Sequence, residues 1–263
     1  MSRDVRHLRA VIAGLVGFAA AEEEMLLVAG AVADAPGGAG ALADGLGTGA
    51  GAGTGDAEGP DRWAAVPLLA HATEFKSQQA ERIRALRSGH TPPAFGEIGH
   101  SSPDVYAGYA SLAADQVIGS SRAVTAALLD GVRELAEEDL LDPSRHPWLN
   151  GRTLWLQVIV RGFWHPTGHI ADYYLGHGQP ERAVALQEHA LATTRYLGAP
   201  DPAAGMAAYG LACAQVQAGL GTDEAASVLA LAIGLNPDLR ANASRDPDLA
   251  PLRDSGQLTQ ILA

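Results

Sequence analysis

Apolar residues recur every three or four positions along most of this chain, and no stretch shows a convincing alternation of apolar and polar residues. The first spacing places apolar side chains on one face of an α-helix, whereas alternation marks a half-buried strand. The pattern therefore predicts an all-α protein. Hydrophobic residues make up 47% of the 263 residues and charged residues 18%, so the chain has enough apolar material for a packed core.

The helical pattern predicts four long helices, over about residues 4–33, 61–88, 102–141 and 152–175. Gly89 is the expected stop of the second helix, and the third is expected to break near Gly119. Pro166, inside the fourth helix, clashes with the carbonyl of Gly162, so a kink or a new helix start is expected there. Four long helices joined by loops predict a helical bundle over residues 1–176.

The connection between the first two helices is unusual in composition. Residues 35–60 consist mainly of Gly, Ala and Thr without a hydrophobic period, which predicts a flexible linker within the bundle. Basic residues before an apolar run at the N-terminus are typical of a signal peptide, but one helix over residues 4–33 also explains the apolar residues after Glu24. The run is too short to span a bilayer, so we expect a cytoplasmic protein without a membrane segment.

The charge balance and the cysteine content exclude several classes of protein. Acidic residues outnumber basic ones by 30 to 18, which gives a formal charge of -12. Since nucleic-acid binding needs clustered Lys and Arg to neutralise phosphates, we expect no such surface. The single cysteine, Cys213, can form neither an internal disulfide nor a thiolate metal cluster, and we expect it to be buried and inert.

The C-terminal part of the chain predicts shorter helices, over about residues 180–196, 202–220 and 223–235. Its small and large residues match the spacing of one tetratricopeptide repeat at Tyr209, Ala212, Cys213, Val216, Ala225, Leu229, Ala232 and Pro237. A lone repeat cannot bury its own face, so we expect residues 177–263 to form tetratricopeptide-like hairpins that share a helix with the bundle. Such a region can bind a peptide or a partner protein, and a homodimer is also compatible with the pattern.

Three histidines are candidate metal ligands. His165 and His169 are four residues apart, which places both imidazoles on one helix face, and His71 lies in an apolar stretch of the second helix. Neutral imidazoles that converge inside a bundle can bind a divalent metal through nitrogen. The spacing alone also fits partly buried or surface histidines, because it does not show whether His71 faces the other two.

Two segments resemble the DinB-like superfamily of four-helix bundles. Residues 62–71, RWAAVPLLAH, resemble the tryptophan-then-histidine motif that opens its second helix, and residues 154–170, LWLQVIVRGFWHPTGHI, resemble its final bundle helix. The superfamily includes mycothiol-dependent maleylpyruvate isomerases, bacillithiol transferases and colibactin self-resistance proteins. In its metal-binding branches one histidine of the second helix joins two of the last helix. The resemblance therefore implies that His71, His165 and His169 bind a divalent metal (Zn, Ni or Fe).

The resemblance also implies a class of reaction. A DinB-like enzyme of this kind would be a metal-dependent transferase, isomerase or hydrolase that activates a thiol or water toward a small-molecule substrate, with mycothiol as the thiol in an actinobacterial host. Glu74, one turn after His71, and Asp172, one turn after His169, are the candidate catalytic residues, and Arg161 or Arg152 can hold an acidic substrate.

Two other functions remain open from the sequence. One is a metal-independent protein that binds or destroys a toxic metabolite, as in the self-resistance branch. The other is an adaptor that recruits a partner protein through the helical repeats. The repeat region and the long linker both depart from the usual pattern of the superfamily.

The lengths of the two connections lead to a prediction about proteolysis. Only residues 176–179 separate the fourth predicted helix from the repeat region, and apolar residues on both sides can pack together, so the two parts should behave as one unit. Brief digestion should cut within residues 35–60 and leave residues 61–263 as one fragment on a denaturing gel. Early cleavage near Gly178 that releases two folded pieces would contradict this prediction.

Overall fold

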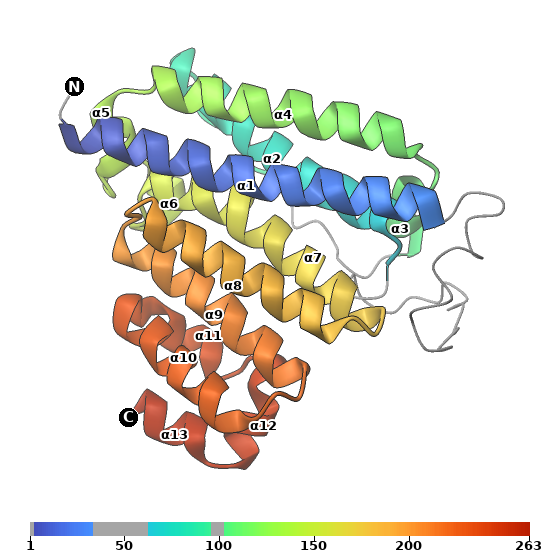
Figure 1. The fold of residues 1–263 in the computed structure, drawn as a ribbon. Helices are drawn as coiled ribbons and strands as arrows, with labels where there is room; N and C mark the ends of the chain where they lie inside the picture. The colour runs from blue at the N-terminus through green and yellow to red at the C-terminus, as the bar shows by residue number, and fades with distance from the viewer. Residues whose placement is uncertain (1–2, 34–62, 96–102) are drawn as a thin grey trace.

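Four long helical segments pack together in the N-terminal part of the chain (Figure 1). They are α1 (Arg3–Ala33), α2 (Ala65–Arg87), α4 (Ala114–Glu134) and the run of α6 (Leu154–Ile159), η4 (Val160–Trp164) and α7 (His165–Gly176). The structure is a computed structural model that describes residues 3–33, 63–95 and 103–263. Those ranges contain helices and no strand, which confirms the all-α prediction. The predicted linker over residues 35–60 lies outside them.

The third predicted helix is interrupted at a different place from the one expected. It consists of α3 (Pro103–Ala110), α4 and the short α5 (Glu137–Leu141), and its breaks fall at residues 111–113 and 135–136. The prediction of a break at Gly119 is wrong, because this residue lies inside α4, where an isolated glycine costs only about 1 kcal/mol. The helix restarts where the Gln116 side chain accepts a hydrogen bond from the Ala113 backbone N–H.

Pro166 changes the last bundle helix without ending it. One π-turn, η4, precedes the proline, and the backbone N–H of His165 donates to the carbonyl of Val160 instead of the carbonyl one residue later. This wider turn takes up the register shift at a residue that cannot donate a backbone hydrogen bond. The predicted irregularity is therefore a π-turn, and α7 continues from it.

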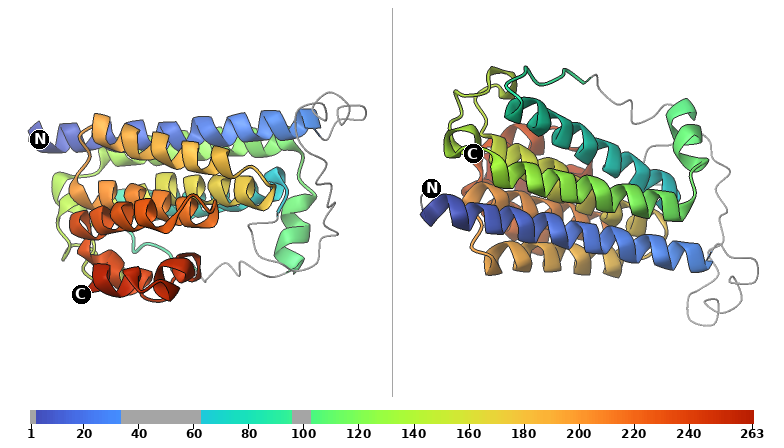
Figure 2. Two further views of the ribbon diagram at one scale, coloured as in Figure 1. Left: turned by 60° about the horizontal axis from the view of Figure 1, so that its bottom comes forward. Right: turned by 90° about the horizontal axis from the view of Figure 1, so that it is seen from above.

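The C-terminal helices stack in chain order below α7 in Figure 1, and in the left view of Figure 2 the last of them lie on the side away from α1. The longer ones are α8 (Pro180–Tyr196), α9 (Asp201–Gln217) and α10 (Thr222–Leu235). They are followed by the short elements η5 (Pro237–Leu239), α11 (Arg240–Ala243), η6 (Pro247–Leu249), α12 (Ala250–Asp254) and α13 (Gln257–Leu262). No helix in the described part of the chain is long and apolar enough to cross a membrane.

Glycine residues end helices where the chain turns sharply, as between α7 and α8. At the end of α7, Gly178 has a φ of 69°, its N–H donates to Leu175, and the next N–H, of Gln179, donates to Tyr174. These bonds form a Schellman motif, which turns the chain sharply toward α8. The same pattern with Gly89 ends α2, so the stop predicted from the sequence is confirmed.

The C-terminal helices pack directly on the bundle. Helix α8 contacts both α7 and α1, and buried residues from α1 through α13 belong to one continuous apolar core. In a second cluster, Ala183 and Leu186 of α8 pack with Ile170 and Ala171 of α7. This arrangement confirms that the connection at residues 176–179 joins packed elements.

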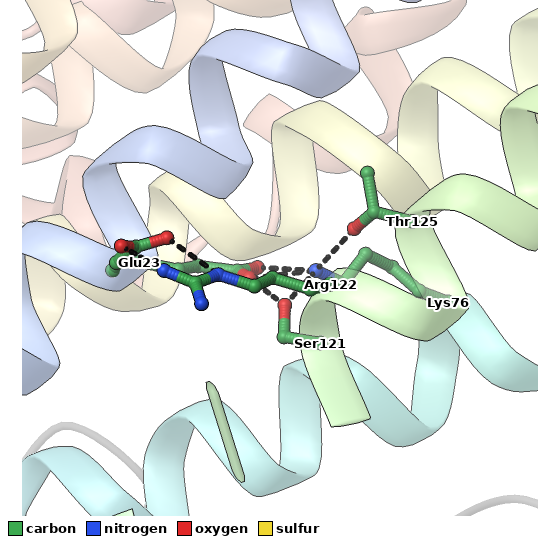
Figure 3. Close-up of polar contacts among 6 residues, drawn as sticks. Glu23, Lys76, Ser121, Arg122 and Thr125 are labelled. Atoms are coloured by element: carbon green, nitrogen blue, oxygen red, sulfur yellow. Dashed lines mark hydrogen bonds and ion pairs between the residues drawn. The ribbon is translucent and has the colours of Figure 1, made fainter. Parts of the chain in front are cut away.

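A buried ion pair fastens α2 to α1 and α4 (Figure 3). Lys76, the only lysine in the chain, and Glu23 are each 1% exposed, with 2.6 Å between Nζ and Oε2. Lys76 also donates to Ser121 Oγ at 2.9 Å, and Ser121 donates to the same carboxylate oxygen of Glu23 at 2.6 Å. All three partners are therefore hydrogen-bonded, as buried charges require.

Removing one member of this pair should destabilise the fold far more than breaking a surface pair. Lys76→Met leaves the Glu23 carboxylate buried without its cation, so the free energy of unfolding in urea should fall by about 3–5 kcal/mol. The matched control is Arg122→Ala, which removes an exposed ion pair with Glu24 and should change the free energy of unfolding little. Adding Glu23→Leu to Lys76→Met should restore most of the loss. If Lys76→Met and Arg122→Ala lowered the free energy of unfolding equally, the buried ion pair would stabilise the fold no more than the surface pair does.

Candidate metal centre

The three predicted histidines come together between α2 and α7. The ring centroid of His71 lies 5.5 Å from that of His165 and 5.2 Å from that of His169. The rings of His165 and His169 are 4.4 Å apart, since the two residues are one helical turn apart on α7. One potential ligand nitrogen from each histidine lies within 4.8 Å of the other two. The structure thus answers the question that the spacing left open: His71 faces the other two histidines.

Burial sets the chemistry of this cluster. His71 is fully buried, and His165 and His169 are partly buried. Both ring nitrogens of His169 are buried, and neither forms a hydrogen bond with a described residue. A buried polar atom without a partner is costly, and metal coordination is one way to satisfy it. Three nitrogen donors, one of them with both nitrogens available, form a donor set that fits a divalent transition metal.

Aromatic residues surround the cluster on the α2 side. Phe75, one turn after His71, lies 4.8 Å from its ring and 4.3 Å from that of His165. Trp63, just before α2, packs edge-on against His71 at 5.8 Å, and Tyr109 of α3 lies 6.1 Å from the same ring. These rings pack against the imidazoles of His71 and His165 on one side of the cluster.

Glu74 follows His71 by three residues on α2 and contacts Tyr109 of α3. Its carboxylate accepts a hydrogen bond from the Tyr109 hydroxyl. Burial and this carboxylate raise the pKa of Tyr109, so its hydroxyl stays protonated and remains a donor. Glu74 therefore ties α3 to α2 beside the cluster. Its proposed part in catalysis stays a prediction.

Asp172 lies on the other side of the histidines. Its Oδ2 is 3.8 Å from Nδ1 of His169, one turn earlier on α7, which is too long for a hydrogen bond. Asp172 also lines a cavity of about 420 Å³ between α7 and α9. The carboxylate thus stands between the histidine cluster and this cavity.

The cavity contains Cys213 together with Asp246 and Asp248. Tyr209 donates a hydrogen bond to Asp246 at 2.6 Å. Burial, with the two nearby carboxylates, raises the pKa of the Cys213 thiol well above its usual value, so the thiol stays protonated. The prediction that Cys213 is unreactive agrees with this environment, although its side chain is only partly buried.

The two arginines considered for an acidic substrate have different positions. Arg152 is exposed before α6, whereas Arg161 lies in the π-turn, with its guanidinium carbon 4.4 Å from the centre of the Phe75 ring. Tyr109, which contacts His71, and Arg82, which lies near Arg161, were not predicted from the sequence. Tyr109 comes from a separate helix, and Arg82 shares a helical face with His71 but is separated from it by three turns, so no short motif indicates either residue.

Searches of known protein families, of curated proteins and of solved structures find no match to this chain.

Proposed function

We propose that the protein is a metal-dependent enzyme acting on a small molecule, with His71, His165 and His169 as the metal ligands. The observation that carries this proposal is the convergence of three imidazoles from two helices, with donor nitrogens within 4.8 Å of one another. Zn, Ni and Fe are the candidate metals, because imidazole suits all three. When bound, such a metal would polarise a substrate oxygen or lower the pKa of a coordinated thiol or water.

The residues of this chain have distinct parts in the proposed site. The aromatic side chains of Trp63 and Phe75 hold the histidines in place and exclude water from one side. Asp172 favours the ligand orientation of His169 in which Nδ1 faces the carboxylate and Nε2 is left for the metal. Glu74 is the candidate base, and its bond from Tyr109 fixes its orientation.

The finer assignment of the fold belongs to the same proposal. We infer that residues 1–176 form a DinB-like bundle and residues 177–263 a tetratricopeptide-like region. The motifs at residues 62–71 and 154–170 support the first part, and the histidines they contain are those that converge. The stacked helices α8, α9 and α10, each packed on the next, support the second part.

The metal content of the purified protein tests the ligand set. Protein from cells grown with zinc, nickel and iron salts should contain about one equivalent of one metal per chain, measured by elemental analysis. His71→Ala, His165→Ala and His169→Ala should each lower the content severalfold, and the triple variant should contain none. His90→Ala, which changes an exposed histidine after α2, is the matched control and should keep the metal. Stoichiometric metal in the folded triple variant would rule out the ligand set.

Thermal stability gives a second test, which needs no substrate. A ligand that binds only the folded state stabilises it by about 2.7 kcal/mol at a hundred times its dissociation constant. The melting temperature of metal-stripped protein should therefore rise on addition of the bound metal, and that of the triple variant should not. If wild type and triple variant shift equally, the metal binds elsewhere, and the metal-independent alternative becomes the better account of the bundle.

A further inference from the structure

Two neighbouring arginines, one of them a single helical turn before His165, have no acidic partner in the described part of the chain. Arg82 of α2 and Arg161 of the π-turn are both partly buried. The Nε atom of each is buried and forms no hydrogen bond with a described residue. Neither arginine forms an ion pair with another described residue. Arginine side chains usually lie in solvent, where water satisfies the guanidinium group and no acidic partner is needed.

The two guanidinium groups lie close enough to repel each other. Burial lowers the pKa of both, and the positive charge of Arg82 lowers that of Arg161 further. Neither pKa is raised by a nearby carboxylate, in contrast to Arg122 and Arg145, which pair with acids. Two adjacent cations that are partly withdrawn from water are less favourable than exposed ones, and a bound anion would compensate them.

The surroundings of the pair are aromatic. The guanidinium carbon of Arg161 lies 4.4 Å from the centre of the Phe75 ring, and that of Arg82 lies 5.0 Å from Phe95 and 5.3 Å from Trp148. Phe75 in turn packs against His165 at 4.3 Å. Arg161 is therefore linked to the histidine cluster through one aromatic ring, that of Phe75, and Arg82 lies near Arg161.

We propose that Arg82 and Arg161 form a subsite for the carboxylate of the substrate. The proposal rests on the proposed function, because the rest of that substrate would lie against the histidine cluster. A guanidinium fork matches a planar carboxylate through two parallel hydrogen bonds. The aromatic walls favour a planar organic acid over phosphate, which is more strongly hydrated and carries no apolar group to pack on them. The substrate class is thus a small carboxylic acid with a flat or unsaturated body.

Binding of benzoate to the metal-stripped full-length protein tests the subsite. Isothermal titration should detect benzoate and give much weaker binding for benzamide, which has the same shape without the charge, and for inorganic phosphate. Arg82→Gln and Arg161→Gln should each weaken benzoate binding by about tenfold or more, since a hydrogen bond to a charged group contributes that much. Arg152→Gln, at an exposed arginine, is the matched control and should bind benzoate like wild type.

The result can be separated from the fate of the metal proposal. Benzoate should bind the triple histidine variant as well as it binds metal-stripped wild type, whether or not the histidines hold a metal. The subsite would be refuted if benzoate bound no better than benzamide, if phosphate bound more tightly than benzoate, or if the two arginine variants bound benzoate like wild type.

Stability separates a binding role from a structural one. Because each arginine is a partly buried charge without an acidic partner among the described residues, its replacement by glutamine should leave the melting temperature unchanged or raise it. A fall in the melting temperature of both variants with unchanged benzoate affinity would assign the pair to the fold and overturn the subsite.

Discussion

The buried pair of Lys76 and Glu23 fixes the rotation of α2 about its own axis. At about 100° per residue, His71, Phe75 and Arg82 lie within about 40° of one another and about 120° away from Lys76. While Lys76 is bonded to α1 and α4, this second face of α2 must point toward α7. The ion pair of Lys76 and Glu23, which lies outside the candidate site, therefore orients the other face of α2, with His71, Phe75 and Arg82.

The π-turn likewise orients the side chains of the last bundle helix, which carries His165 and His169. Gly162, inside the turn, is buried, and a side chain there would lie 2.8 Å from Val16 of α1 and 3.3 Å from Leu128 of α4. The last bundle helix can therefore approach α1 and α4 closely at this point only because the residue is glycine. The register change before Pro166 then sets where His165 and His169 point. A local backbone irregularity thus determines the side-chain geometry of the candidate site.

The charged side chains along the last bundle helix change from positive to negative, from η4 to the middle of α7. Arg161 stands at one end, His165 and His169 follow, and Asp172 lies at the other end beside the cavity between α7 and α9. A molecule that lies along α7 would meet a cation, then the imidazoles, then a carboxylate. The C-terminal helices therefore take part in the environment of the site, because α8 and α9 cover the side of α7 that carries Asp172.

The sequence by itself determined the helical class, most helix boundaries and the pairing of His165 with His169, because these depend on local spacing, on proline and on glycine at helix ends. It also indicated the tight connection to the C-terminal helices. It did not reveal that Glu23 is buried, since three consecutive glutamates look like a solvated face, nor that Tyr109 contacts His71 and that Arg82 lies near Arg161. Those facts arise from contacts between elements far apart in the chain. Only the tertiary structure decided that His71 faces α7, because the rotation of α2 is fixed by Lys76 and its partners on α1 and α4.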